Sequence, residues 1–518
     1  MYRYVYSAAV SGMRTFLVRV ECDARDGLPS FNMVGGVLPV VREAGERAMS
    51  ALSNSGFSLK PKKILVNLSP AGLKKEGAYF DLPIAMAVLA AVMELDEDEL
   101  NQTAFCGELS LSGNVAPVPS VLPFVLAAKN AGIKRFVLPM RNVKEANEVP
   151  GIDIIGVRSL EEAALLLISG FKEEVLTFEK ENGSDSLPGS EPLYEDACSD
   201  DMAFPDMADI RGQESVKRAA LVAACGMHNL ALIGSAGSGK SSIAKRITGI
   251  LPPLSFEESI EVSKVYGING LSSGDLIKTP PFRSPLHTIS LTGLCGGKTG
   301  PGEMALANRG VLFLDELPES RLECIEALRE PLEERKIAVS GKSGVVTYPA
   351  FFMTVIAANP CPCGFYPDRR RCRCTDGMIK KYMGKISRAV WDRIDITAVT
   401  EEVSFEAEKK DKKRISSSEM RKTVERVRNI QKERFKDEGI LFNCEMDMDL
   451  IDRYCRLTEE ESDLLKQSIE AGFLSARSQK RVLQVARTLA DIEGKKDIGI
   501  NHLAESIHYK SAVAAYIS

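Results

Sequence analysis

A glycine-rich loop between an apolar run and a helix-forming run constrains this chain of 518 residues more than any other feature. Residues 229–234 predict a short buried strand, and residues 242–247 predict the start of a helix. In this setting the glycines let backbone N–H groups converge on phosphate oxygens, Lys240 adds a positive charge, and Ser241 offers a hydroxyl to Mg²⁺. The strand–loop–helix order disfavours the alternative, a glycine-rich turn that binds no ligand. The loop therefore predicts binding of a nucleoside triphosphate through Gly234, Ser235, Ala236, Gly237, Ser238, Gly239, Lys240, Ser241 and Ser242.

The composition is that of an ordinary soluble protein. The chain is 26% charged and 44% hydrophobic, and its length predicts two to four domains. We find no apolar stretch long enough to span a bilayer and no signal peptide, so we expect a cytoplasmic protein without a membrane partner. In that reducing compartment the 12 cysteines predict thiols or metal ligands rather than disulfides. The net charge of −5 leaves any contact with nucleic acid to a local basic surface.

Shifts in pattern divide the chain into four regions. Residues 1–170 alternate strand-like and helix-like segments, whereas residues 171–206 are acidic, polar and rich in turn-forming residues, which predicts a flexible linker. Residues 207–400 contain the phosphate-binding loop and predict the nucleotide-binding core. Residues 401–518 are charged and helical in pattern. Within the first region, strands are expected at 15–21 and 63–68, and a helix is expected at 41–55.

Two apolar runs downstream of the loop end in residues suited to nucleotide hydrolysis. Residues 310–314 predict a strand that ends at Asp315 and Glu316, where the first carboxylate can hold Mg²⁺ and the second can polarise the attacking water. This signal is weak alone and strong after a phosphate-binding loop. A further strand at 354–358 ends at Asn359, whose amide can orient water or sense the γ-phosphate. The simpler alternative is an asparagine that forms a turn before proline.

Arginines beyond the third strand can complete such a site. Arg393 can reach the nucleotide of a neighbouring subunit and stabilise charge on the transferring phosphoryl group. On residue pattern alone, a surface arginine paired with Asp392 or Asp395 is the favoured alternative. Spacing leaves open three candidates for a lid-domain arginine that contacts the γ-phosphate, namely Arg477, Arg481 and Arg487.

A cluster of cysteines follows the third strand. It has a C-x-C, eight residues, C-x-C spacing and consists of Cys361, Cys363, Cys372 and Cys374. Four thiolates within such a short segment can close tetrahedrally around Zn²⁺, and free thiols packed near the strand are the alternative. The densest basic run of the chain, residues 369–371, lies between the two cysteine pairs. It can contact DNA phosphates or form a solvated loop tip.

Short motifs in a fixed order along nearly the whole chain carry a family resemblance. They lie at residues 209–214, 228–230, 251–254, 281–285, 301–303, 314–319, 328–333, 359–364, 392–395 and 474–477. With these motifs the chain resembles the magnesium-chelatase-related branch of the AAA+ ATPases, and within that branch the ComM (YifB) group. A series of ordered matches is hard to produce by chance.

The resemblance implies a function and a set of partners. It implies a homo-hexameric ring with ATP and Mg²⁺ at the subunit interfaces, Arg393 as the arginine finger and Arg477 as the second sensor. It also implies a motor that translocates on single-stranded or branched DNA and drives branch migration, a step of homologous recombination, during natural transformation. Contacts with DNA phosphates in the pore would use basic side chains such as Lys298. The alternative is a chelatase-like, ATP-driven remodeller of a protein or cofactor-enzyme partner.

Residues 1–165 resemble the fold shared by the Lon protease domain and a ribosomal-protein-like superfamily. A serine–lysine protease needs a serine whose proton a neutral lysine accepts. The matching positions hold Tyr79 and Leu122, so we expect an inactive protease-like domain with a structural or DNA-guiding role. The predicted fold class is α/β, with this N-terminal α+β domain, an AAA+ P-loop core with a parallel sheet, and a C-terminal helical lid.

Overall fold

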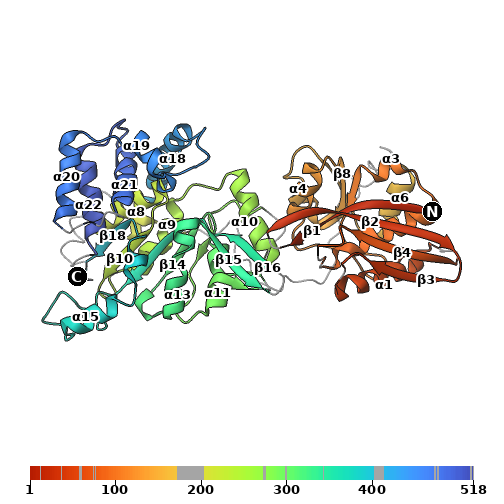
Figure 1. Cartoon of the computed structure of the whole chain (residues 1–518), viewed down its shortest axis with the longest axis horizontal. Coiled ribbons are helices and arrows are strands. Elements are labelled where there is room, and N and C mark those ends of the chain that lie inside the picture. The colour runs from red at the N-terminus through yellow and green to blue at the C-terminus, as the bar shows by residue number, and fades with distance from the viewer. Residues whose placement is uncertain are drawn as a thin grey trace. The chain divides into compact units, whose positions relative to one another are not determined.

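The computed structural model divides the chain into two compact units (Figure 1). The first unit contains Met1–Ala197 together with Ser259–Ile277. The second unit contains Cys198–Glu258 and Lys278–Ser518.

The structure describes most of the chain, with gaps. It covers residues 1–518 apart from 12, 37, 58–60, 74, 76, 172–203, 272–275, 298–299, 342–343, 402–413, 472–473, 475–477, 514–515 and 517–518. Lys298, Arg477 and nearly all of the predicted linker therefore lie outside the described residues. Among the described helices, none combines the length and the hydropathy that crossing a bilayer requires.

The first unit is built on a seven-stranded mixed sheet in the order β3-β4-β2-β1-β5-β8-β9. Its strands are β1 (Tyr2–Ser11), β2 (Arg14–Asp26), β3 (Ser30–Val34), β4 (Lys62–Ser69), β5 (Thr103–Phe105), β8 (Arg135–Pro139) and β9 (Asp153–Val157), beside a small pair β6 (Glu108–Leu109) and β7 (Val115–Ala116). β2 pairs antiparallel with β1 and β4, and the other neighbours are parallel. Val18, Val20, Cys22 and Ala24 of β2 are buried at every second position, as the period of a strand requires. The strands predicted at 15–21 and 63–68 lie within β2 and β4.

Helices cover this sheet and bury its apolar face. They are α1 (Pro39–Asn54), α2 (Asp81–Met93), α3 (Glu97–Leu100), α4 (Leu122–Asn130), α5 (Val143–Ala146) and α6 (Leu160–Ile168). α2 is buried from Asp81 to Ala91. The buried Asp81 carboxylate accepts two hydrogen bonds from Arg47 of α1, at 2.8 and 3.0 Å, and one from the Leu109 N–H at 3.0 Å. This buried ion pair joins the two helices at the start of α2.

A segment from the middle of the chain also packs in the first unit. This segment, Ser259–Ile277, contains most of helix α10 (Phe256–Ile268). Ile260 and Leu276 pack in the hydrophobic cluster around α4. In sequence the segment lies inside 207–400, but apolar contacts rather than chain order decide where it packs.

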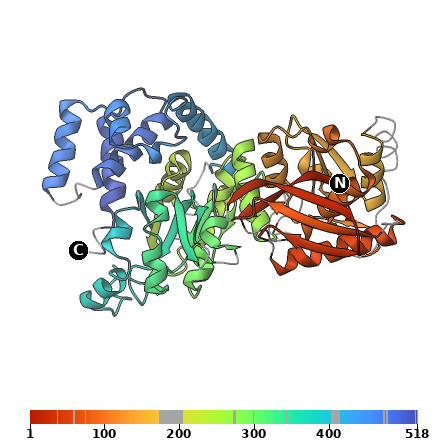
Figure 2. The ribbon, with the colours of Figure 1, turned by 45° about the vertical axis from the view of Figure 1, so that its right-hand side comes forward.

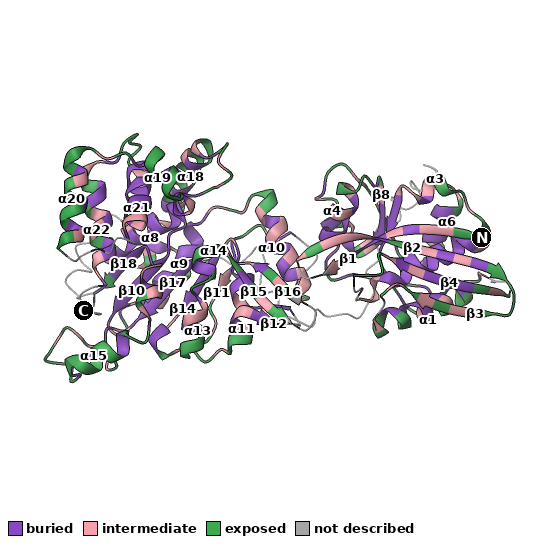
Figure 3. Cartoon of the chain, in the orientation of Figure 1, coloured by how far each residue is buried: buried purple, intermediate pink, exposed green. Residues whose placement is uncertain are grey.

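The second unit contains a five-stranded parallel sheet in the order β11-β14-β17-β10-β18. Its strands are β10 (Leu230–Gly234), β11 (Phe282–Arg283), β14 (Val311–Leu314), β17 (Met353–Ala358) and β18 (Ile396–Thr400). Every residue of β10, β14 and β17 is buried (Figure 3), as is typical of parallel strands covered on both faces. Because the strands run in one direction, the carboxyl ends of β14, β17 and β10 lie side by side at one edge of the sheet.

Helices surround this sheet and form a separate group at the C-terminus. Near the sheet are η3 (Met207–Asp209), α8 (Glu214–Gly226), α9 (Lys240–Ile250), α11 (Leu291–Cys295), α12 (Glu303–Leu306), η4 (Leu317–Glu319), α13 (Leu322–Ala327), α14 (Pro331–Glu334), α15 (Asp376–Met383) and α16 (Arg388–Trp391), with hairpins β12 (Gly296–Gly297)/β13 (Gly300–Pro301) and β15 (Lys336–Gly341)/β16 (Gly344–Pro349). The C-terminal group, blue in Figures 1 and 2, contains α18 (Ser417–Arg434), α19 (Met448–Tyr454), α20 (Glu459–Glu470), α21 (Ser478–Ile492) and α22 (Ile500–Ser511). The predicted fold class, α/β with a parallel-sheet core and a helical C-terminal region, is confirmed.

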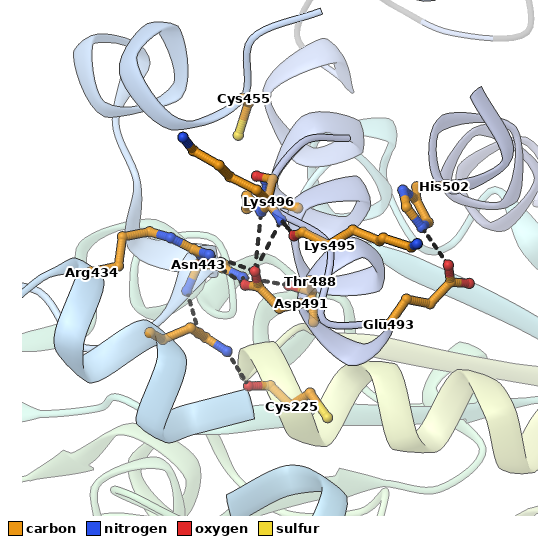
Figure 4. A network of polar contacts seen from close by, with 12 residues as sticks. Cys225, Arg434, Asn443, Cys455, Thr488, Asp491, Glu493, Lys495, Lys496 and His502 are labelled. Carbon is orange, nitrogen blue, oxygen red and sulfur yellow. Dashed lines mark hydrogen bonds and ion pairs between the residues drawn. The ribbon is translucent and has the colours of Figure 1, made fainter. Parts of the chain in front are cut away.

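A buried polar network fastens the C-terminal helices to α8 (Figure 4). Asp491 of α21, 1% exposed, accepts a hydrogen bond from Arg434 of α18 at 2.7 Å and another from the Asn443 amide at 2.9 Å. The Asn443 N–H donates to the Gln431 side chain at 2.8 Å, and Gln431 donates to the Cys225 carbonyl of α8 at 2.8 Å. Hydrogen bonds shielded from water in this way hold the helical region in a defined position on the sheet domain.

Candidate active site

The phosphate-binding loop has the backbone that its glycines permit. Gly237 and Gly239 have φ angles of 82° and 86°, in the left-handed region that favours glycine. Gly239 caps α9, which begins at Lys240, so the unpaired N–H groups of the first helical turn lie in the loop. At Gly234 a Cβ atom would lie 2.0 Å from the Thr400 hydroxyl, and only glycine fits there.

Lys240 is held among oxygen acceptors at the edge of the sheet. Its ammonium donates to Gly234 O at 2.8 Å, Ser235 O at 2.7 Å and Asn359 Oδ1 at 3.1 Å. Burial lowers the pKa of Lys240, and the charges of Asp315 and Glu316 oppose that shift. Phosphate oxygens are stronger acceptors than carbonyls, so the same three donors are suited to a triphosphate.

The ligands expected for Mg²⁺ lie in contact. The Ser241 hydroxyl donates to Asp315 Oδ2 at 2.7 Å, which brings together a hydroxyl and a carboxylate of the kind that Mg²⁺ prefers. Glu316 follows in a left-handed conformation with φ of 48°, and its N–H donates to Asp315 Oδ1 at 3.0 Å. The Ser242 hydroxyl instead accepts from Arg246 at 2.6 Å, one turn further along α9.

Strand order brings these residues together. Asn359 follows β17, which lies between β14 and β10. The carboxyl ends of the three strands therefore place Asn359 between Asp315 and the loop, and its amide oxygen accepts from Lys240. Four of the predicted site residues, Lys240, Ser241, Asp315 and Asn359, are thus joined by hydrogen bonds within one protomer.

Thr400, which the sequence analysis did not single out, braces the loop from the neighbouring strand. Its hydroxyl lies 2.7 Å from the Ser238 hydroxyl, and Ser238 also donates to Ser235 O at 2.8 Å. Thr400 ends β18, which pairs with β10 up to Gly234. The contact spans 162 positions, so the only signal in the sequence was a small polar residue at the end of an apolar strand.

Arg393 lies at the edge of the sheet opposite to the phosphate-binding loop. It precedes β18, so it is at the amino ends of the strands, whereas the phosphate-binding loop follows β10 at their carboxyl ends. Its guanidinium pairs with Glu333 and donates to the Ala389 carbonyl at 2.7 Å. Neither flanking aspartate is the carboxylate that pairs with it, because the buried Asp395 instead accepts from the Asn229 N–H at 2.8 Å.

Two of the three lid arginines are described, and both are engaged in ion pairs. Arg481 lies 3.5 Å from Asp395. Arg487 is 1% exposed and lies 3.1 Å from Asp491, in the network that fastens the lid. Arg477 lies outside the described residues, so its role as second sensor stays a prediction.

The four cysteines form one cluster after β17. The Sγ atoms of Cys361, Cys363, Cys372 and Cys374 all lie within 4.8 Å of one another. The Sγ atoms of the first three lie 3.4, 3.6 and 3.8 Å apart in pairs. A tetrahedral zinc site with Zn–S bonds of about 2.3 Å puts its sulfurs about 3.8 Å apart. The geometry therefore suits a four-thiolate metal site and is too open for disulfides, whose S–S bond is about 2.0 Å.

The segment that contains the cysteines touches the phosphate-binding loop. Gly364 has φ of 81°, and a Cβ at this position would lie 3.5 Å from the Cβ of Ala236. Helix α15, which follows the cysteine segment, is largely exposed (green in Figure 3) and contains the exposed Lys380 and Lys381. Arg370 is 93% exposed and pairs with Asp368 at 3.2 Å, and Arg369 pairs with Asp376.

Comparisons with known proteins show similarity over nearly the whole chain. Family models match in three parts: magnesium chelatase, subunit ChlI, over residues 206–408; subunit ChlI of Mg-chelatase over 20–142; and the ChlI C-terminal model over 414–510. The competence protein ComM of Haemophilus influenzae is 36% identical over 519 residues, which cover 98% of this chain and 97% of ComM. The uncharacterised protein YifB of Escherichia coli is 36% identical over 511 residues, 98% of this chain and 96% of YifB.

The chain belongs to the ComM/YifB group of magnesium-chelatase-related AAA+ ATPases. The family resemblance stated from the motifs is confirmed. Membership in this group makes the protein an ATPase of the ComM type that uses ATP and Mg²⁺.

The N-terminal unit of this ComM-type ATPase has a local relative among proteases. Lon protease 2 of Bacillus subtilis is 30% identical over 118 residues, which cover 23% of this chain and 21% of that protein. Tyr79 packs its ring 4.7 Å from that of Phe124, and Leu122 is fully buried. A phenol in an aromatic stack and a buried alkyl chain supply neither the nucleophile nor the base of a serine–lysine pair.

A buried lysine nevertheless lies in the N-terminal unit. Lys75 is 0% exposed, and its ammonium donates to Gly35 O at 2.9 Å, to Leu68 O at 3.0 Å and to Pro70 O. Burial lowers the pKa of Lys75. These three acceptors are backbone carbonyls, so Lys75 ties the turn after β4 to the loop after β3.

Proposed function

We propose that this ComM-type ATPase is a homo-hexameric motor that translocates on DNA and drives branch migration, a step of homologous recombination, during natural transformation. Similarity to a competence protein over nearly the full length, at 36% identity, supports the DNA part of the proposal. Eleven free cysteines among the described residues support a cytoplasmic location.

The position of Arg393 is the observation that best supports the proposed ring. The loop that binds phosphates and the loop that contains Arg393 lie at opposite edges of one sheet, separated by the five residues of β10. Five residues of strand span about 16 Å, which is longer than an arginine side chain. Arg393 therefore acts on the nucleotide of the next protomer, and only a closed ring gives every site such a partner.

Within one site, the chain's own residues divide the work. Lys240 neutralises charge on the transferring phosphoryl group, and Ser241 and Asp315 hold Mg²⁺. Glu316 polarises the attacking water, and Asn359 orients it or senses the γ-phosphate. Most of the rate enhancement then comes from charges placed before the reaction begins.

We propose Zn²⁺ as the occupant of the four-cysteine cluster. Sulfur separations near those of a tetrahedral site and burial of Cys361, Cys372 and Cys374 support it. The test is metal analysis of purified protein beside Cys363→Ser, with Cys295→Ser outside the cluster as the matched control. Less than about half an equivalent of zinc in the unmodified protein rejects the site.

Exposed basic side chains within and just after the four-cysteine cluster are the proposed DNA contact among the described residues. Arg371, Arg373, Lys380 and Lys381 are all exposed. Binding through phosphates depends on salt, so the affinity for single-stranded DNA should fall steeply as salt rises. Replacing Lys380 and Lys381 by glutamine should reduce that slope by about two if both contact phosphates.

A chelatase-like remodeller is the second candidate, and the match to magnesium chelatase models over three parts of the chain favours it. A four-stranded junction assay separates the two functions. Strand exchange that requires ATP and is abolished by Lys240→Ala supports the DNA motor. Absence of strand exchange, together with ATPase activity that DNA does not stimulate, supports the remodeller.

Mixed rings test the proposed finger directly. Arg393→Ala protomers keep an intact nucleotide site, and Lys240→Ala protomers keep an intact finger. Each variant alone should retain only a small residual activity, and a mixture should recover ATPase activity because some interfaces combine the two intact halves. No recovery on mixing would show that Arg393 does not act across the interface.

A further inference from the structure

The loop that contains Arg393 is held through its carbonyl groups. This finger loop, residues 391–394, consists of the last residue of α16 and the turn that leads toward β18. Its four consecutive carbonyls all accept hydrogen bonds from side chains far away in sequence. A loop of this kind is normally hydrated, so complete pairing by distant side chains fixes its position on the domain.

Lys510 of α22 supplies three of these hydrogen bonds. Its ammonium donates to Trp391 O at 3.2 Å, Asp392 O at 3.0 Å and Ile394 O at 2.5 Å. The residue is buried, and burial lowers its pKa to about 8 while Asp395 and Asp392 oppose the shift and Arg481 adds to it. An ammonium has three donors, and all three are used on this one loop.

Asn229 supplies the fourth hydrogen bond and connects the finger loop to two strands. Its amide N–H donates to Arg393 O at 3.1 Å, while its Oδ1 accepts from the Thr354 N–H of β17 at 3.0 Å. Its backbone N–H donates to Asp395 Oδ2 at 2.8 Å, and its carbonyl accepts from Ile396 N at 3.0 Å. Asn229 directly precedes β10, so it joins the amino ends of β17, β10 and β18.

We propose that Lys510 and Asn229 are positioning residues for the arginine finger, which they fix to the C-terminal helices and to the strands of the nucleotide site. β10 leads into the phosphate-binding loop and β17 into Asn359, so a shift of either strand reaches Arg393 through Asn229. This inference rests on the proposed action of Arg393 across the interface.

The test uses Lys510→Met in the full-length protein, because methionine keeps much of the side-chain volume and removes the donors. Alone, it should lower kcat for ATP hydrolysis by about 10- to 100-fold while the KM for ATP changes less than about threefold. Lys436→Met, at an exposed lysine paired with Glu433, is the matched control and should keep full activity. A rise in KM with unchanged kcat would overturn the proposal.

A double-mutant cycle separates positioning from general stability. If Lys510 acts through Arg393, Lys510→Met should cause no further loss of kcat when Arg393 is already alanine. A multiplied loss in the double variant would show an independent structural role and overturn the proposal. The cycle remains informative even if the Lys510→Met variant is less stable, because the rates compared are the residual ATPase rates of folded rings.

Mixed rings then distinguish this inference from the proposed function. Lys510→Met protomers mixed with Lys240→Ala protomers should recover activity as Arg393→Ala protomers do, because the second protomer supplies a correctly held finger. If Arg393→Ala recovers and Lys510→Met does not, the positioning role is wrong. If neither recovers, the action of the finger across the interface is wrong.

Discussion

The two units of this protein each bury a lysine with three oxygen acceptors, yet only one of these lysines lies in a chemical site. Lys75 of the first unit donates to three backbone carbonyls. Lys240 of the second unit donates to two loop carbonyls and to Asn359, and the charges of Asp315 and Glu316 act on its pKa. Burial lowers the pKa of both lysines, so burial alone does not identify function.

The difference lies in what surrounds the ammonium. Around Lys240, the residues that we propose bind magnesium and polarise water come from three adjacent strand ends of one parallel sheet. The ammonium of Lys75 instead joins the loop after β3 to the turn after β4. We therefore expect substitution of Lys240 to change rate and substitution of Lys75 to change stability.

The largest expected effect is that of Lys240→Met. The substitution removes the positive charge that Lys240 places beside the transferring phosphoryl group. This loss should lower kcat by about 10²- to 10³-fold, in the range found for single groups that stabilise a transition state. Phosphate release measures the rate. Labelling of the buried thiols Cys22 and Cys106 under urea should be unchanged, since both lie in the first unit. Labelling of Cys22 or Cys106 at lower urea than in the unmodified protein would show that Lys240 also stabilises the first unit.

Lys75→Met should act in the opposite way. It leaves three backbone carbonyls without this donor, and we expect the first unit to lose about 2–3 kcal/mol of unfolding free energy. The urea midpoint for labelling of Cys22 should fall, while that for Cys225 in the second unit should not. ATPase turnover per folded molecule should stay within about twofold. A loss comparable to that of Lys240→Met would mean that the first unit takes part in hydrolysis.

The pH dependence of stability gives a third comparison. The folded pKa of Lys75 is lowered from 10.5 by burial, so at pH values between the two the unfolded chain binds more protons. The free energy of unfolding of the first unit should therefore rise with pH through this window, by at most about 1.4 kcal/mol per unit, and level off above the unfolded value. Below the folded pKa both states are charged, so the slope vanishes there. Subtracting the Lys75→Met profile isolates this contribution, and a difference that falls with pH would refute the assignment.

The smallest expected effect is at Thr400. Thr400→Val removes the hydrogen bond to Ser238 and should weaken ATP binding by about 1 kcal/mol, or roughly fivefold, with little change in kcat. Equilibrium binding of a fluorescent ATP analogue measures it. Thr400→Ser keeps the hydroxyl and is the matched control. Equal affinities of the valine and serine variants would show that the brace does not act on nucleotide.

The sequence could predict which candidate residues lie together at the nucleotide site because each follows a short apolar strand with a recognisable ending. Strand order then brings Asp315 and Asn359 to the loop, as parallel sheets require. The cysteine cluster could equally be predicted, because its four thiols are close in sequence.

Contacts between distant positions could not be predicted in this way. Asn229, Thr400 and Lys510 act on residues more than 100 positions away, and no local pattern records such pairs. The packing of Ser259–Ile277 in the first unit was missed for the same reason. Arg393 was predicted from the family motif, whereas its pairing with Glu333 depends on the folded positions of both.

One short strand, β10, has consequences for how variants behave in a cell. Its carboxyl end leads to the phosphate-binding loop, and Asn229 at its amino end holds the loop of Arg393, the proposed finger for the next protomer's nucleotide. A protomer with a defect in β10 would therefore impair two nucleotide sites in an assembled ring, its own and that of the next protomer. Such alleles should be dominant, interfering with the intact protein when both are expressed together.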